Sequence, residues 1–406
     1  MLPTIAWRNV WRNPGRSLVV ILAVALGIWA LIFSMGFYNV IGISFVNNGI
    51  ENQHGHIQIH HPEFKTDYDT KYQINDITQV LDQLSKQPNI QASTHRILCN
   101  GMLNTSRGSS GVQIIGIKPS TEAAISKLDT KIVEGAYLDE KARKSKPILI
   151  SRLQAKKQKL KIRSKVILNF QSPSGEIIRE SFKVVGLIDS KNSQLDESRV
   201  FVRDNDLKEL LNMLGSSHET VSLLHQPQQL EQTAALIKAQ HPELLVETWR
   251  EASPELQLME SQIVQSMFIF IFIVMLALTF GIINTMLMAI LERIKEIGML
   301  MAVGMTKGRI FSMIVIETLL LSLVGVPLGI LIGYVTLSYY NYYGLDLSNY
   351  GEGLSEFGME TIIYPELGFE YYLFIAASVA ITAIIASMYP ALKAIRLKPV
   401  EAIRSL

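Results

Sequence analysis

Long apolar runs alternate along this chain with segments of ordinary polarity. Ser17–Phe45 and Ser261–Leu291 contain no charged residue, and both exceed the roughly 20 apolar residues that cross a bilayer core. Thr318–Tyr340 and Tyr371–Leu392 are two further runs of sufficient length. Because only helices satisfy their own backbone hydrogen bonds in lipid at these lengths, the pattern predicts a membrane protein with four transmembrane α-helices.

Between the first two runs, β-rich stretches alternate with amphipathic helical stretches, which predicts a large extracytoplasmic α+β domain inserted between helices 1 and 2. The predicted strands are His56–His60, Val112–Ile117, Lys165–Phe170, Ile177–Leu187 and Val200–Arg203. The predicted helices are Asp76–Lys86, Arg152–Leu160, Asp204–Leu214 with Asp204 as its cap, and Gln229–Gln240. Ser172–Gly175 predicts a hairpin turn. We expect two subdomains on a stalk formed by the outer ends of the first two spans.

The basic residues that flank the spans lie on one side of the predicted membrane. They are Arg8, Arg12, Arg16, Arg293, Lys295, Lys307, Arg309, Lys393, Arg396, Lys398 and Arg404. The loop Gly344–Glu370 on the other side contains acidic residues and no Lys or Arg. By the positive-inside rule we expect a multi-pass protein of the plasma (inner) membrane with both termini in the cytoplasm.

Composition agrees with this class, since 48% of residues are hydrophobic and only 18% are charged. A net charge of +2 indicates no nucleic-acid partner. The single cysteine, Cys99, excludes a disulfide within the chain, and we expect it to be a small packed residue. Lys141–Lys165 contains basic residues and no acid. This run is either a solvated helix and turn or a surface for anionic headgroups or an acidic partner.

No catalytic or metal motif is present. The sequence contains no GxxxxGK[ST], GxSxG or HExxH pattern, so we expect no enzyme activity, no cofactor and no metal site on this chain. His54, His56 and His60 alternate with Ile57 and Ile59, which is typical of a half-buried strand with one polar face rather than of a metal site.

Few polar residues interrupt the spans, so a water-filled path for a polar solute is not expected. For Asn284 we expect a hydrogen bond between helices, and for Glu317 an ion pair with Arg309 or Lys307. A row of glycines, each four residues from the next, favours close approach of another helix, in the same chain or in a second copy. These helix-packing residues are Gly325, Gly329 and Gly333.

Two segments at the cytoplasmic side are candidates for function. Before the break at Asn13–Gly15, the face formed by Trp7, Val10 and Trp11 beside Arg8 and Arg12 predicts an interfacial helix in contact with membrane lipids. In Leu291–Gly304 a charged helix is followed by a turn at Gly298 and a Met-rich amphipathic stretch, which suits docking into a groove of a cytoplasmic partner.

Leu291–Gly304 resembles the ERxxEIGxxxAxG signature of the MacB/FtsX-type permease superfamily of ABC transporters. The matching residues are Glu292, Arg293, Glu296, Ile297, Gly298, Ala302 and Gly304. Two terminal groups are also similar to the family: Arg8, Asn9, Arg12 and Asn13 at the start, and Tyr389, Pro390, Ala391, Ala394, Leu397, Pro399, Val400, Glu401 and Ala402 at the end. Within the superfamily, Gly55–Leu258 looks closest to the lipoprotein-releasing permeases LolC and LolE, through Gly55–His60 and Trp249–Leu256.

The resemblance implies a mechanotransmission permease that forms a dimer with a second copy or a homologue. Each permease would bind a separate cytoplasmic ABC ATPase, which holds Mg-ATP, through the signature residues acting as a coupling helix. The leading function implied is release of lipoproteins from the inner membrane to a periplasmic carrier. The alternatives are MacB-like efflux of peptides or antibiotics with a periplasmic adaptor, and FtsX-like signalling that controls a cell-wall hydrolase.

These expectations divide the chain into nine segments. In order they are an amphipathic cytoplasmic helix (1–16), helix 1 (17–45), the extracytoplasmic domain with its stalk (46–262), helix 2 (263–291), the coupling-helix loop (292–309), helix 3 (310–343), an external acidic loop (344–370), helix 4 (371–392) and a cytoplasmic tail (393–406).

Overall fold

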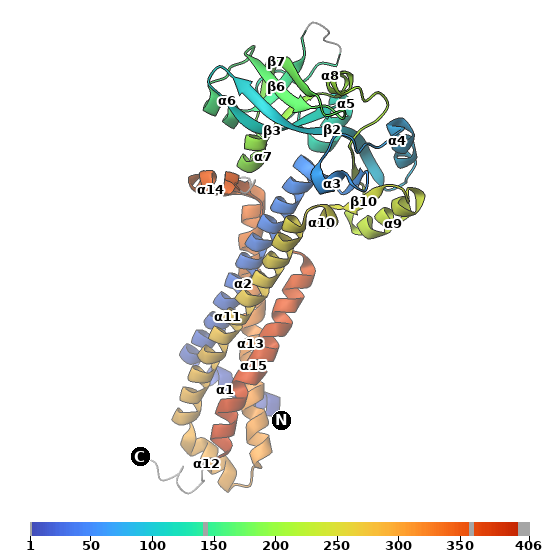
Figure 1. Cartoon of the computed structure of the whole chain (residues 1–406). Coiled ribbons are helices and arrows are strands. Elements are labelled where there is room, and N and C mark those ends of the chain that lie inside the picture. Colours follow the sequence, from blue (N-terminus) through green and yellow to red (C-terminus); the bar gives the residue numbers. More distant parts are fainter. Residues whose placement is uncertain (1, 141–144, 357–360, 397–406) are drawn as a thin grey trace. The chain divides into compact units, whose positions relative to one another are not determined.

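The computed structural model describes residues 2–140, 145–356 and 361–396, and these residues form two compact units (Figure 1). Unit 1 comprises Met1–Gly42, Ser261–Asp346 and Ile362–Leu406, and unit 2 comprises Ile43–Glu260 and Leu347–Thr361. The predicted acidic loop is therefore divided, because its middle part packs with unit 2. Glu360 of this loop lies outside the described residues, as do Lys141, Arg143 and Lys144 of the basic run.

Unit 1 is built from long apolar helices. Its helices are α1 (Leu2–Arg12), most of α2 (Pro14–Gly49), most of α11 (Pro254–Glu292), α12 (Ile294–Ala302), α13 (Lys307–Tyr343) and α15 (Phe369–Ile395), with a short strand pair β11 (Leu345–Asp346) and β12 (Ile362–Ile363). Within the described residues, four helices are long and apolar enough to cross a membrane: Ser17–His54, Pro254–Glu292, Lys307–Tyr343 and Phe369–Ile395. The predicted four spans are confirmed.

The spans of unit 1 are apolar on every side. Ile28, Leu31 and Val379 are fully buried in the core that the helices of unit 1 share. Phe272 and Leu331 remain more than half exposed. A helix that is hydrophobic all round matches a lipid environment, since its outer side chains need an apolar solvent.

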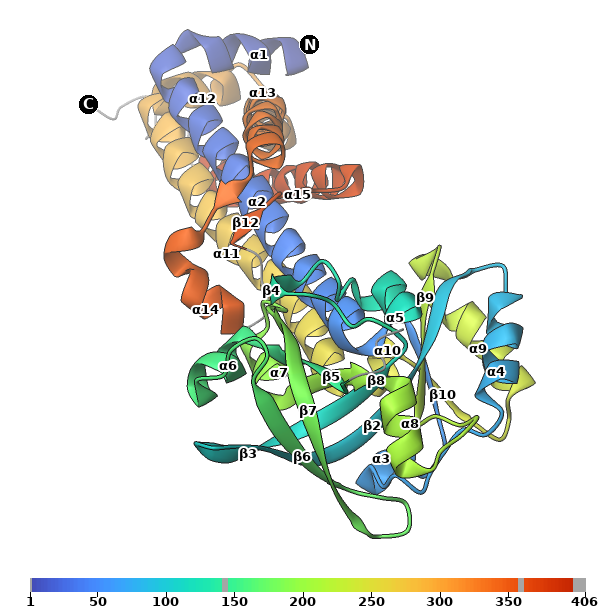
Figure 2. The same ribbon diagram turned by 90° about the horizontal axis from the view of Figure 1, so that it is seen from above.

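Unit 2 is built on one large mixed sheet covered by short helices (Figure 2). Its strands are β1 (Ile57–His60), β2 (Ile90–Thr105), β3 (Gly108–Ile117), β4 (Ile132–Gly135), β5 (Pro147–Ser151), β6 (Lys165–Gln171), β7 (Ile177–Ile188), β8 (Arg199–Arg203), β9 (Glu219–Leu224) and β10 (Leu245–Thr248). The order is β10-β1-β9-β2-β3-β8-β5-β7-β4, with β6 paired to β2 and β7. The α+β domain is confirmed.

Short helices accompany this sheet in unit 2, and the first of them follows α2 directly. They are the π-helix η1 (Ile50–His54), α3 (Phe64–Asp67), α4 (Ile77–Ser85), α5 (Pro119–Ser126), α6 (Arg152–Gln158), α7 (Ser193–Ser198), α8 (Asp204–Leu211), η2 (Pro227–Gln229), α9 (Leu230–Gln240), α10 (Trp249–Ala252), η3 (Ser348–Tyr350) and α14 (Gly351–Glu356). Figure 2 shows α4 and α9 side by side at the end of the sheet that carries β9 and β10. Both pack into one cluster there, while a second cluster lies under β2, β3 and β5–β8. A third cluster, which includes Phe64 and Leu149, also lies in unit 2, so the two expected subdomains are replaced by one continuous sheet with three cores.

Sequence patterns missed half of the sheet. β2 is its longest strand with 16 residues, and it was not predicted, nor were β4, β5, β9 and β10. Polar residues such as His95 and Arg96 lie inside β2 and interrupt its alternation, because they are buried with partners rather than solvated. Cys99 on the same strand is buried as expected, and burial raises the pKa of its thiol to about 12.

The interpretation of the histidine-containing strand is wrong in two respects. β1 is buried on both faces, because β9 and β10 pair with its two edges and side chains cover both sides. His60 stacks on Phe64 with ring centroids 5.7 Å apart, so this face is not solvated. His54 lies in η1 rather than on the strand.

Two local predictions can be compared directly with the structure. The hairpin between β6 and β7 is confirmed, and Gly175 has φ +88° in its turn, where a side chain would be strained. Asp204 is not the cap of α8, because that position is occupied by Arg203. The Asp204 carboxylate instead lies 3.0 Å from Nε2 of buried His95 and 3.1 Å from Nζ of Lys208.

Candidate functional site

The break between α11 and α12 separates a span from the segment that matches the permease signature. Arg293 forms this break with φ −105° and ψ 19°. Gly298, where the turn was expected, lies inside α12 and is buried together with Ile297. The turn was misplaced because a buried glycine in a helix serves packing as readily as bending. Gly304, with φ +101°, allows the chain to leave α12.

Ion pairs hold α12 to neighbouring helices of unit 1. Arg293 Nη1 lies 3.1 Å from Glu317 Oε1 on α13, and Arg293 Nε lies 3.4 Å from Glu296 Oε2. Arg12 Nη2 on α1 lies 2.6 Å from Glu296 Oε1. Glu317 therefore pairs with Arg293 and not with Arg309 or Lys307, which corrects the expectation. Two signature residues are thus bound within the chain.

The electrostatics of Glu296 follow from these contacts. Partial burial alone would raise the pKa of its carboxyl group, but the hydrogen bonds and charges of Arg12 and Arg293 outweigh burial and lower the pKa. Glu296 is therefore ionised at neutral pH and joins α1 to α12 by a charged contact.

Several apolar side chains of this segment are exposed beside the exposed Lys295. Met299 is 60% exposed, Leu300 is 37% exposed and Val303 is 84% exposed. Glu292 and Ala302 of the signature are also exposed. Flexible Met side chains beside aliphatic ones form an adaptable surface for a partner groove.

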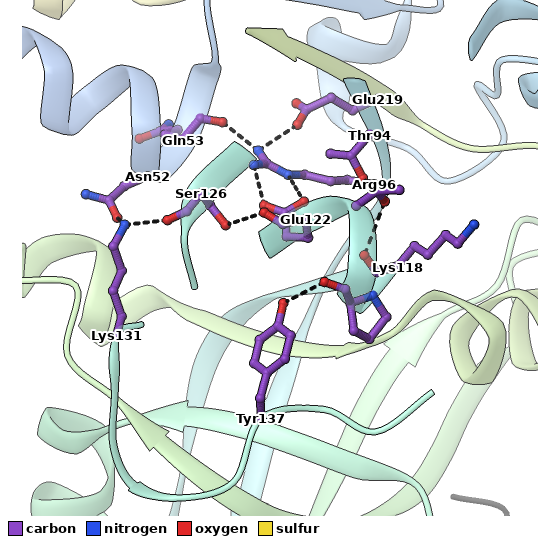
Figure 3. A network of polar contacts seen from close by, with 12 residues as sticks. Asn52, Gln53, Thr94, Arg96, Lys118, Glu122, Ser126, Lys131, Tyr137 and Glu219 are labelled. Atoms are coloured by element: carbon purple, nitrogen blue, oxygen red, sulfur yellow. Dashed lines mark hydrogen bonds and ion pairs between the residues drawn. The ribbon is translucent and has the colours of Figure 1, made fainter. Parts of the chain in front are cut away.

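A second candidate site lies in unit 2, where η1 meets the sheet (Figure 3). Arg96 on β2 binds Glu122 of α5 with both ends of its guanidinium, at 2.7 and 3.1 Å. Its Nη1 also lies 3.2 Å from Glu219 Oε1 of β9 and donates to the carbonyl oxygen of Gln53 in η1 at 2.6 Å. One buried cation thereby joins four elements.

Charge is poorly screened in this network. The side chains of Arg96, Glu122 and Glu219 are at most 8% exposed. Burial raises the pKa of Glu219 even though Arg96 opposes the effect. One sequence feature could have indicated this network, because Arg96 lies directly before the apolar residues Ile97 and Leu98. The partners of Arg96 could not be identified in this way, because they come from segments far away in sequence.

Comparison with known families covers both units. The model described as FtsX-like permease C-terminal matches residues 268–399. The model described as MacB-like periplasmic core domain matches residues 17–240, which is more than half of the 406 residues. This chain belongs to the MacB/FtsX-type permease superfamily of ABC transporters.

Individual relatives of this permease align only in part. The macrolide export ATP-binding/permease protein MacB of Syntrophobacter fumaroxidans is 32% identical over 125 residues, which cover 30% of this chain and 15% of that protein. MacB of Escherichia coli is 41% identical over 61 residues, which cover 15% of this chain and 9% of that protein.

Two solved structures are also similar to this permease. The periplasmic region of MacB from Actinobacillus actinomycetemcomitans has a TM-score of 0.36 and 15% identity, and covers 50% of this chain and 94% of that one. The extracellular domain of YknZ from Gram-positive bacteria has a TM-score of 0.34 and 15% identity, with 47% and 98% covered. TM-scores this low carry no further conclusion.

The glycine row of the permease faces a helix of the same chain. A Cβ atom on Gly329 would lie 2.7 Å from the carbonyl oxygen of Ala25 on α2, and one on Gly333 would lie 2.8 Å from Ile32 Cδ1. Gly325 is equally close to Val24 at 2.9 Å. Of the two alternatives, the row therefore serves α2–α13 packing within the chain, and α13 continues through Pro327.

The first helix of the permease presents two different faces. Val10 is 1% exposed and packs into the core of unit 1. Trp7 and Trp11 are 44% and 49% exposed, and Arg8 and Arg12 are exposed too. The expected grouping of Val10 with the tryptophans on one face is wrong. Val10 directly precedes Trp11, and consecutive side chains of a helix point about 100° apart, so Val10 can be buried while Trp11 is exposed.

The C-terminal part of the family resemblance is described only up to residue 396. Pro390, Ala391 and Ala394 are buried in α15. Tyr389 is exposed on the same helix. The other similar residues and two of the flanking basic residues lie outside the described residues: Leu397, Lys398, Pro399, Val400, Glu401, Ala402 and Arg404.

Proposed function

We propose that this permease is the membrane subunit of a mechanotransmitting ABC transporter, moved by a separate cytoplasmic ABC ATPase that holds Mg-ATP, and that it acts as a dimer of permeases. The observation that supports this most directly is the exposed apolar surface of Met299, Leu300 and Val303. That surface is mounted on a helix held to α1 and α13 by ion pairs. A helix fixed in this way can transmit a movement of a bound partner to the spans.

In this proposal α12 and both termini face the cytoplasm, and the α+β domain faces the periplasm. Lys295 in α12 and Lys307 and Arg309 at the start of α13 supply the positive charge that the positive-inside rule requires on this side. The exposed Trp7 and Trp11 of α1 would lie in the inner leaflet, where indole rings prefer the headgroup level.

Release of lipoproteins from the inner membrane is the first client function that we propose, on the resemblance of Gly55–His60 and Trp249–Leu256 to lipoprotein-releasing permeases. Efflux of peptides or antibiotics is the second candidate, favoured by the match to MacB proteins. Both functions use the same coupling and differ in what binds the periplasmic domain.

The docking proposal is tested by charging the α12 surface. Val303→Glu should abolish co-purification of the cytoplasmic ATPase from native membranes, because it places a carboxylate in the apolar contact. Leu214→Glu is the matched control, since Leu214 in unit 2 is also 84% exposed. Equal ATPase recovery with both variants would contradict docking at α12.

The client is tested with the co-purified complex in proteoliposomes. Lipoprotein release predicts that a radiolabelled lipoprotein leaves the liposome only with ATP and a periplasmic carrier. Efflux predicts instead that a macrolide or peptide raises ATP turnover while the lipoprotein stays bound. Absence of both effects, with the ATPase still attached, would refute transport and leave a signalling role.

A further inference from the structure

A polar cleft of about 560 Å³ lies within unit 2 beside the outer end of α2. Three chain segments form its walls: the α2–η1 junction, the turn after α5 and the turn after β7. The residues lining it are Ser44, Asn47, Asn48, Glu51, Asn52, Lys127, Thr130, Lys131, Val133, Asp189, Ser190 and Lys191. None of the functions above uses this cleft.

The first wall is a polar stripe on a helix that is otherwise apolar. Its five residues recur at spacings of three and four and so share one helical face: Ser44, Asn47, Asn48, Glu51 and Asn52. Ser44 lies at the end of the apolar run Ser17–Phe45, and the other four residues follow that run directly. A polar face at this place requires polar surroundings, which the cleft provides.

Named bonds hold the three walls together. Lys127 Nζ lies 3.0 Å from Glu51 Oε1. Lys131 Nζ donates to Asn52 Oδ1 at 2.5 Å, as Figure 3 shows. The backbone N–H of Asp189 donates to the carbonyl oxygen of Lys131 at 3.0 Å. The cleft is therefore a built site whose shape does not depend on a ligand.

Lys131 supplies a cation whose contacts are all neutral. Its ammonium group donates to Asn52 Oδ1 and to the carbonyl oxygen of Ser126 at 2.6 Å. Among the residues that the structure describes, no carboxylate lies within 4.0 Å of it. Burial lowers the pKa of Lys131, as expected for a cation that lacks a direct counterion. A third N–H of the ammonium group is left for a ligand.

The lining determines the kind of anion. Three lysines face two carboxylates, of which Glu51 is paired with Lys127 and Asp189 accepts from the backbone N–H of Lys191. The amide and hydroxyl groups can both donate to and accept from hydroxyl groups. Among the lining residues that the structure describes, Val133 is the one aliphatic residue and no aromatic ring is present. The hydrogen-bonding groups of the lining therefore favour a polar ligand over a nucleobase, which would lack a stacking partner.

We propose that this cleft binds a phosphate ester of a small polyol, with Lys131 contacting the phosphate and the asparagine stripe contacting the hydroxyl groups. Glycerol phosphate has this chemistry, either free or as the headgroup of phosphatidylglycerol. A bound ligand bridges the outer end of α2 to the turns after α5 and β7. It thereby stabilises the junction through which α2 is joined to the sheet.

Binding is tested with the full-length protein in two settings. In detergent, sn-glycerol 3-phosphate is titrated up to about 10 mM by calorimetry. This concentration range detects even weak binding, with a dissociation constant of about 1 mM. In nanodiscs, the unfolding temperature is compared between phosphatidylcholine alone and a mixture with phosphatidylglycerol. Saturable binding in detergent identifies the free ester as the ligand, and stabilisation by phosphatidylglycerol alone identifies the headgroup. Failure of both overturns the proposal.

Variants separate the cleft from general effects of charge. Lys131→Met should weaken binding about tenfold or remove the lipid effect, because one charged hydrogen bond is lost. Lys86→Met, an exposed lysine on the flank of α4, should leave both unchanged. Asn47→Asp adds a carboxylate to the lining at an exposed position and should weaken binding without removing any bond of the walls. If Asn47→Asp and Lys131→Met both bind as the wild type does, the site is not this cleft. ATPase binding at α12 is a separate readout, so failure here leaves the proposed function intact.

Discussion

Single buried charges determine the local structure of unit 2. Arg96 satisfies the carboxylates of Glu122 and Glu219 in a region where water is excluded. An ion pair of this kind contributes little relative to an apolar replacement of all partners, but removal of one partner leaves an uncompensated charge. Arg96 is therefore a position at which one substitution has a large effect.

Arg96→Met should lower the free energy of unfolding by about 3 kcal/mol or more, because Glu122 and Glu219 would stay buried without their cation. The loss should shrink as pH falls from 8 to 5, since Glu219, whose pKa is raised by burial, can then bind a proton in the folded state. Calorimetric unfolding of the full-length protein measures both effects. Arg107→Met, at an exposed hairpin position, serves as the control. A loss no larger than that of the control would contradict the role of Arg96.

Asp204 predicts a pH dependence in a lower pH range, because its pKa is lowered rather than raised. Burial alone would raise its pKa, but the hydrogen bond with His95 and the charge of Lys208 lower it to about 2. Because the folded-state pKa lies below the ordinary value, the stabilisation is present above about pH 4 and is lost as pH falls towards 2.

Asp204→Asn should therefore cost about 2 kcal/mol at pH 7. The difference between wild type and variant should decrease below pH 4, as followed by chemical unfolding at each pH. Asp82→Asn, an exposed carboxylate on α4, should have no comparable effect. A difference that is constant across this pH range would show that the effect is not electrostatic.

At the scale of elements, spans and amphipathic segments could be predicted because their periodicity is local. The four spans, the hairpin β6–β7 and the helices α4, α6, α8 and α9 lie where the pattern predicted them. The partners of Gly325, Gly329 and Gly333 could not be predicted, since a row of glycines shows that something packs closely without showing what. The structure identifies α2 as that neighbour.

Gly329→Leu should destabilise unit 1 by roughly 1–3 kcal/mol, because the new side chain meets the α2 backbone and forces the two helices apart. Gly281→Leu on α11 is the matched control, as no atom lies within 4 Å of its Cβ position. The unfolding temperature in detergent distinguishes the two. Equal temperatures would mean that α2 and α13 do not pack along this row.

Glu296 joins α1 and α12 through a largely exposed ion pair, so its role is positional rather than stabilising. Glu296→Lys should leave the unfolding temperature within a few degrees and should reduce ATP turnover coupled to the permease. The double variant Arg12→Glu with Glu296→Lys restores the opposite charges and should recover part of the coupling. No recovery, with the ATPase still bound, would exclude the α1–α12 contact from coupling.

At the scale of the whole molecule, the basic residues that flank the spans predict how the protein is oriented in the membrane. Labelling of single cysteines tests this orientation. With Cys99 replaced by alanine, Leu214→Cys should react with a membrane-impermeant maleimide in spheroplasts. Val303→Cys should react only after permeabilisation. Both positions are 84% exposed, so a difference in labelling reports the side of the membrane. Labelling of Val303→Cys from outside would reverse the proposed topology.

The sequence by itself determined the membrane class, the number of spans, the α+β domain between the first two and the family signature. Each rests on composition or on spacing within one segment. Only the tertiary structure decided that Arg293 pairs with Glu317, that Arg96 joins η1 to the sheet, and that Lys131 lines a polar cleft. These contacts join residues from distant segments, and a partner from a distant segment is set by the packing of the whole unit rather than by any local pattern.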